Sequence, residues 1–159
     1  MSKRRKIEIM DTTLRDGEQT NNVSFSATEK LSIAKLLLEE LHVDRIEIAS
    51  TRVSEGEFNA VKSITEWAAE AGYIDKIEVL SFVDKGLSID WMVKTGAKVQ
   101  NLLTKGSMNH LTHQLKKTPD EHFKEIAESI RIGLENGIDT NVYLEDWSNG
   151  MRNSPDYVF

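Results

Sequence analysis

The nonapeptide DTTLRDGEQ, residues 11–19, decides the fold of this chain, and it follows the short apolar run Ile7–Met10. The run predicts a first strand, so the nonapeptide begins where that strand ends. Arg15 offers a fork of N–H donors, and Asp16 offers an oxygen ligand for a hard cation. Gly17 allows a sharp turn directly after them. The stretch predicts a site for a cation and a negatively charged substrate oxygen; the alternative interpretation is a surface ion pair between Arg15 and Asp16.

Five apolar runs alternate with stretches that carry apolar residues at helical spacing. The runs are Ile7–Met10, Arg45–Ala49, Lys76–Phe82, Lys98–Leu103 and Asn141–Glu145. Alternation of strands and helices indicates an α/β fold with a parallel sheet. The runs alone fit two architectures, a five-stranded flavodoxin-like sheet and the opening part of a longer barrel.

Helix boundaries are marked by capping residues and glycines. Capping-box spacing occurs at Ser26 with Glu29, Ser54 with Glu57, and Thr118 with Glu121, the last followed by Pro119 at the first helical position. Helix stops are predicted at Gly72, Gly96 and Gly137. A further start at Ser154-Pro155 predicts a helix near the last residue, Phe159.

The composition excludes several classes of protein. The net charge of −6 argues against a nucleic-acid partner, and the basic cluster Lys3–Lys6 is interpreted as a solvated flank. With no cysteine, the chain has no disulfide or thiolate, which is compatible with the cytoplasm. No stretch is apolar enough to predict a membrane span. A length of 159 residues suits one domain, but a complete TIM barrel typically needs about 250.

The nonapeptide resembles the signature of the synthases that make 2-isopropylmalate, homocitrate and citramalate, a branch of the metal-dependent lyase-type TIM barrels. Its ending Gly17-Glu18-Gln19 favours these synthases over their lyase and aldolase relatives. The resemblance extends from Ile7 to Tyr157. It implies a (β/α)8 TIM barrel, of which residues 1–159 supply about the first five β/α units as the N-terminal part of a catalytic domain. We expect the remainder of the barrel to lie outside this chain.

The resemblance implies a Claisen-type condensation, in which the enolate of acetyl-CoA attacks a 2-oxo acid and the thioester is then hydrolysed. Arg15 would stabilise the developing negative oxygen, and Asp16 would bind a divalent metal, Mn, Mg or Zn. Gln19 would bond to Arg15 or to the substrate. Glu145 would be the acid/base residue; the alternative is a structural pair with a lysine at a strand end.

The residues expected around the substrate favour a small 2-oxo acid. Leu80, Leu103 and Tyr143 would form its wall, and Phe82 would flank acetyl-CoA. A phenol ring and two leucines leave room for about one methyl group, which points to pyruvate and a citramalate product. A 2-isopropylmalate synthase acting on 2-oxoisovalerate is the alternative.

The remaining polar candidates are weaker. Glu47 and Glu78 are interpreted as residues that contact the site residues and not the substrate. His110 and His113 are interpreted as solvated histidines and not as a metal site.

The resemblance also implies a His-x-His pair of metal ligands, and this pair does not occur in the sequence. We therefore expect the chain alone to be inactive and the full-length protein to be active, as a homodimer. A non-catalytic half-barrel that acts through association is the alternative from another class.

Overall fold

A computed structural model describes residues 7–159, so the basic cluster Lys3–Lys6 lies outside the described residues. Five parallel strands form one sheet in the order β1-β2-β3-β4-β5. Their bounds are β1 (Met10–Asp11), β2 (Arg45–Ser50), β3 (Ile77–Phe82), β4 (Val99–Lys105) and β5 (Asp139–Glu145). A flavodoxin-like sheet would place β1 between β2 and β3. The observed order is that of a barrel, and it confirms the predicted partial α/β barrel.

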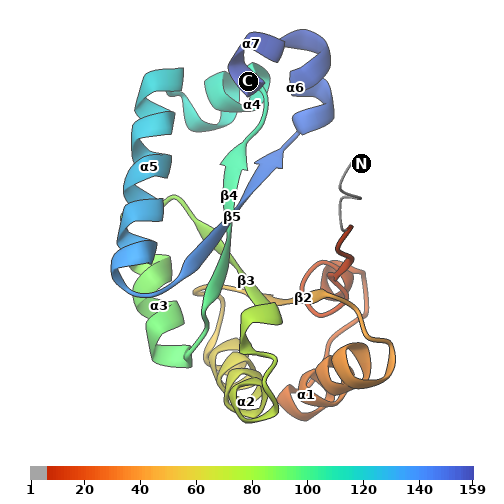
Figure 1. The fold of residues 1–159 in the computed structure, drawn as a ribbon. Helices are drawn as coiled ribbons and strands as arrows, with labels where there is room; N and C mark the ends of the chain where they lie inside the picture. The colour runs from red at the N-terminus through yellow and green to blue at the C-terminus, as the bar shows by residue number, and fades with distance from the viewer. Residues whose placement is uncertain (1–6) are drawn as a thin grey trace, which may run out of the picture.

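The main helices follow one side of the sheet in chain order, which leaves its other side free of helices (Figure 1). They are α1 (Ala27–Lys35), continued by the π-helical segment η2 (Leu36–Glu40), then α2 (Glu55–Ala71), α3 (Leu87–Thr95) and α5 (Pro119–Glu135). Short helical segments are η1 (Gly17–Gln19), η3 (Ile74–Lys76), α4 (Met108–His110), η4 (Leu111–Leu115), α6 (Trp147–Asn153) and α7 (Pro155–Val158). None of the described helices is long and apolar enough to cross a membrane.

The hydrophobic core lies between the sheet and these helices. Ile46, Ile48 and Val79 project from the strands and are fully buried against helix residues such as Ile64 and Met92. Burial of a side chain of this size stabilises a fold by roughly 1.5–3 kcal/mol. Because strand side chains alternate, packing this face of the sheet turns the intervening residues toward the barrel interior.

Two of the three predicted capping boxes are reciprocal. Ser26 and Glu29 exchange hydrogen bonds, as do Thr118 and Glu121, and these bonds lower the pKa of both glutamates. At the start of α2, the side chain of Ser54 accepts a hydrogen bond from the backbone N–H of Glu57. The carboxylate of Glu57 does not return the bond and instead accepts from Lys30. The three predicted stops are confirmed, since the glycines have positive φ: Gly72, Gly96 and Gly137.

The predicted strands β2 to β5 are shifted by one or two residues at their ends, and the larger differences lie in β1 and after β5. β1 has two residues, and Ile7 and Ile9 lie before it with exposed side chains, because this edge strand pairs on one side only within the described sheet. The segment after β5 forms α6, which the sequence did not predict. It begins after Asp146, whose left-handed backbone is held by hydrogen bonds from Ser107 (2.7 Å) and Asn149 (2.6 Å).

Candidate active site

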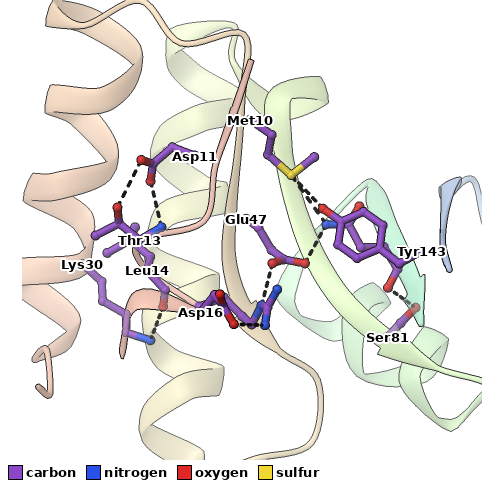
Figure 2. A network of polar contacts seen from close by, with 11 residues as sticks. Met10, Asp11, Thr13, Leu14, Asp16, Lys30, Glu47, Ser81 and Tyr143 are labelled. Atoms are coloured by element: carbon purple, nitrogen blue, oxygen red, sulfur yellow. Dashed lines mark hydrogen bonds and ion pairs between the residues drawn. The ribbon is translucent and has the colours of Figure 1, made fainter. Parts of the chain in front are cut away.

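Two buried carboxylates lie on the inner face of the sheet. Glu47 of β2 has no exposed surface, and its two oxygens accept bonds from Arg15 Nε (2.5 Å) and Asn101 Nδ2 (2.7 Å) (Figure 2). A buried carboxylate is tolerated only when it is paired and hydrogen-bonded in this way. Oδ1 of Asn101 accepts no hydrogen bond within residues 7–159, which leaves one acceptor free in the interior.

A second layer repeats the pattern one strand further along. Glu78 of β3 is also fully buried, and it accepts bonds from Arg45 and from Asn141 Nδ2 (2.8 Å). Interior layers built from alternate strands are the packing rule of parallel barrels. The two glutamates that the sequence left as equal candidates therefore have different partners, and Glu47 is the one that contacts Arg15.

The segment after β1 holds Arg15 in a tight loop. The carbonyl of Thr12 accepts from the backbone N–H groups of Arg15 (3.1 Å), Asp16 (2.8 Å) and Gly17 (3.1 Å). Nη1 of Arg15 contacts Asp16 at 2.8 Å, so the predicted alternative, an ion pair of these two residues, is present. The pair is asymmetric, since the Arg15 side chain is 16% exposed and that of Asp16 is 60% exposed. Arg15 is thus fixed from the interior and Asp16 is open to solvent.

A cavity of about 390 Å³ opens beside this loop at the C-terminal ends of β1 and β2. Its polar lining comprises the carboxylates of Glu18 and Glu57 and the donor groups of Arg15, Gln19, Ser24, Ser50 and Ser54. Gln19 lines the same cavity as Arg15, and its predicted bond to Arg15 or to the substrate stays a prediction. The guanidinium, amide and hydroxyl donors can bind the oxygens of a small anionic ligand.

Tyr143 lies on β5, the edge strand opposite β1, and its side chain points into the same interior. Its hydroxyl group donates to Met10 Sδ, and Figure 2 shows the ring beside Met10 and facing Glu47. Burial, and secondarily the charge of Glu47, raises the pKa of Tyr143 to about 12. The phenol therefore stays protonated and acts as a neutral wall and hydrogen-bond donor near neutral pH.

Leu80 and Leu103, which the sequence predicted as wall residues, lie on the same inner face of the sheet as Tyr143. The register pairs Leu80 with Asn101 and Leu103 with Tyr143. Leu80 is 6% exposed and Leu103 is partly exposed. The structure thus places the three predicted wall residues on one face of neighbouring strands.

A second cavity, of about 260 Å³, lies at the C-terminal ends of β3 and β4. Phe82 and Leu103 line it, together with His122 of α5. His122 is 1% exposed, and its Nε2 accepts from the backbone N–H of Lys105 (3.2 Å). Burial lowers the pKa of His122, with Glu125 opposing the shift. Phe82 therefore lines a cavity with both apolar and charged residues, and its predicted place beside acetyl-CoA stays a prediction.

Glu145 lies at the end of β5, where its carboxylate pairs with Lys105 Nζ. This is the structural pair with a strand-end lysine, the alternative to an acid/base role for Glu145. The side chain of Glu145 remains 39% exposed, so a substrate can still reach it. The register places Leu103 and Tyr143 two residues before this pair on the same face.

The residues of the described chain do not by themselves form a metal site. Within residues 7–159 no three histidine, cysteine or acidic side chains are close enough to hold an ion. His110 lies near Asp146 (3.6 Å) and is partly buried, whereas His113 is exposed as expected. Asp16 is therefore the single predicted ligand that the structure supplies.

Several residues of the two interior layers were missed from the sequence, namely Arg45, Asn101 and Asn141. A signal was present in the strands: Glu47 lies between Ile46 and Ile48, and Glu78 lies between Ile77 and Val79. A charged residue within a buried apolar strand needs a partner from a neighbouring element. That signal predicts partners but cannot identify them.

The chain belongs to the HMGL-like family, since the family model matches residues 6–154, and its fold is that of a partial α/β barrel. The chain is 35% identical to a 2-isopropylmalate synthase of Saccharolobus solfataricus over 98% of this chain and 38% of that protein. It is 36% identical to an (R)-citramalate synthase of Methanocaldococcus jannaschii over 88% of this chain and 27% of that protein. A 2-isopropylmalate synthase of Sulfurisphaera tokodaii is 38% identical over 89% of this chain and 36% of that protein.

The chain therefore spans between about a quarter and two fifths of these relatives. The predicted synthase family is confirmed. The two kinds of synthase match to a similar degree, so the comparisons do not favour citramalate over 2-isopropylmalate.

Proposed function

We propose that the full-length protein is an acyltransferase that condenses acetyl-CoA with a 2-oxo acid. The observation that carries the proposal is Arg15, whose guanidinium group is fixed by buried Glu47 at the C-terminal ends of the strands. A preorganised cation in a water-poor site stabilises negative charge that develops on a substrate oxygen. The curated relatives named as synthases support this chemistry.

Glu145 is proposed as the acid/base residue. Its carboxylate lies at the end of β5 and remains accessible while Lys105 holds it in place. A carboxylate in this position can accept a proton from the methyl group of the acyl donor. Phe82 and Leu103 line the adjacent cavity, and we propose that the acyl chain of acetyl-CoA lies there.

The proposed 2-oxo acid is pyruvate, which gives citramalate. Support comes from Leu80, Leu103 and Tyr143, which share the inner face of neighbouring strands, and we propose that they limit the length of the substrate tail. The second candidate is 2-oxoisovalerate, which is favoured by the relatives named as 2-isopropylmalate synthases. A pocket discriminates by only about 1–3 kcal/mol per methylene, so the preference is a matter of degree.

We further propose that Asp16 contributes one ligand to a divalent metal (Mn²⁺, Mg²⁺ or Zn²⁺) and that the full-length protein is a homodimer. The exposed carboxylate of Asp16 beside Arg15 supports the first point. Oxygen ligands of this type suit hard divalent cations.

The test is CoA release by the full-length protein with pyruvate, 2-oxoisovalerate and 2-oxoglutarate in turn. We expect the highest kcat/KM with pyruvate, and Tyr143→Ala should raise the relative rate with 2-oxoisovalerate by about tenfold. A clear preference of the unmodified enzyme for 2-oxoisovalerate would replace citramalate by 2-isopropylmalate. If CoA is released with none of the three acids, the proposed condensation is wrong.

A further inference from the structure

Lys30, in the first turn of α1, is 1% exposed although its side chain ends in an ammonium group. Burying an unpaired ammonium group costs several kcal/mol, so its contacts must offset that cost. Nζ contacts Glu18 Oε2 (2.6 Å), Glu57 Oε1 (2.6 Å) and the carbonyl oxygen of Leu14 (3.3 Å). Of its N–H donors, one bonds to Glu57 and one to the Leu14 carbonyl, and Glu18 adds an ion pair.

Two of these acceptors belong to the segment that carries Arg15. Leu14 directly precedes Arg15 and is itself fully buried, and Figure 2 shows Lys30 reaching the backbone beside it. Glu18 follows Arg15 by three residues. Its second oxygen accepts from the backbone N–H of Phe25 (2.9 Å), which closes the loop onto the start of α1. Lys30 therefore holds the segment on both sides of Arg15.

The third acceptor, Glu57, belongs to the first turn of α2. Through it, the loop after β1 is tied to two helices, α1 and α2, which themselves pack together. Leu14, Glu18 and Glu57 also line the cavity beside Arg15, so this ion-paired cluster joins the loop to both helices at the wall of the candidate site. Glu18, although it lies in the nonapeptide, is thereby engaged in holding the loop.

We propose that Lys30 is a positioning residue, which acts through Leu14 and Glu18 to keep the guanidinium group of Arg15 in its reactive place. The effect on turnover rests on the proposed function, whereas the effect on the loop does not. A shift of about 1 Å in such a group can cost about 100-fold in rate, so a distant tether has a measurable consequence.

The first experiment measures hydrogen exchange in the full-length protein carrying Lys30→Met. The backbone amides of Arg15, Asp16 and Gly17, which donate to Thr12, should exchange about tenfold faster or more. Lys35→Met is the matched control, since it makes the same change on the same helix but contacts Trp67 instead. Lys35→Met should leave this segment unchanged. Unchanged exchange in Lys30→Met overturns the proposal.

The second experiment measures CoA release. Lys30→Met and Glu18→Gln should lower kcat by about 10- to 100-fold while KM changes less, and Lys35→Met should do neither. If Lys30→Met does not fold, Glu18→Gln carries both measurements. Unchanged exchange in Glu18→Gln would then overturn the proposal. If the unmodified protein releases no CoA, the proposed function fails, and the exchange result still decides the role of Lys30.

Discussion

At the scale of single residues, the contact between Arg15 and Glu47 has the clearest consequence for activity. Glu47→Gln keeps the size of the side chain and a bond to Asn101 but removes the charge that faces Arg15. We expect turnover by the full-length protein to fall by about 100-fold, because the guanidinium group loses its fixed partner. The measurement is kcat for CoA release.

The matched comparison is Glu78→Gln, the same change in the neighbouring interior layer, where the partner is Arg45. Its effect on kcat should be smaller than that of Glu47→Gln at similar thermal stability. Equal losses would mean that the buried carboxylates act on the barrel as a whole and not on Arg15.

His122 gives a prediction for the pH dependence of stability. Burial lowers its pKa in the folded state below the ordinary value of 6.5. The unfolded chain therefore binds a proton first as the pH falls, so stability is present above about 6.5 and is lost as the pH falls through the folded pKa. His122→Gln should flatten this part of the profile, measured as urea unfolding at about pH 7.5 and about pH 5.5. If the stability of His122→Gln falls as steeply with pH as that of the unmodified protein, this prediction is wrong.

At the scale of elements, the seating of α6 depends on a glycine. Gly150 is buried, and a Cβ added there would collide with the backbone carbonyl of Gly106 after β4. Gly150→Ala should therefore cost about 1–3 kcal/mol in the free energy of unfolding, or more if the backbone cannot shift. Gly56→Ala in α2 is the control, since a Cβ there meets only Ser54 Oγ at 3.6 Å. It should be neutral or stabilising, because alanine favours helix by about 1 kcal/mol over glycine.

The elements also show what sequence patterns can and cannot predict. Strand phases and helix starts such as Ser26 and Thr118 were predictable, because they depend on alternation and on contacts three residues apart. α6 was not, since it depends on Asp146 meeting Ser107 from another loop. In the same way, the nonapeptide predicted a site role for Arg15. The contacts of Lys30 with the loop around Arg15 could be found only from the packing of α1 against α2.

At the scale of the whole molecule, the described sheet is open at both edges, because β1 and β5 each pair with one strand only. Next to the β5 edge, outward side chains stay partly exposed: Val142 (44%), Leu144 (41%) and the following Trp147 (48%). Open edges and exposed apolar side chains promote association between chains. The same surface would be covered by further strands and helices in a closed barrel.

These surfaces predict how residues 1–159 behave when produced alone. Size-exclusion chromatography should show species larger than the 18.0 kDa monomer, and Val142→Thr with Leu144→Thr should shift them toward it. The same preparation should bind Mn²⁺ weakly and release no CoA, because the described residues supply Asp16 without further ligands. Asp16→Ala should not change the elution, which separates association from metal binding. A stable monomer that binds Mn²⁺ stoichiometrically would contradict both expectations, since the site would then be complete within this chain.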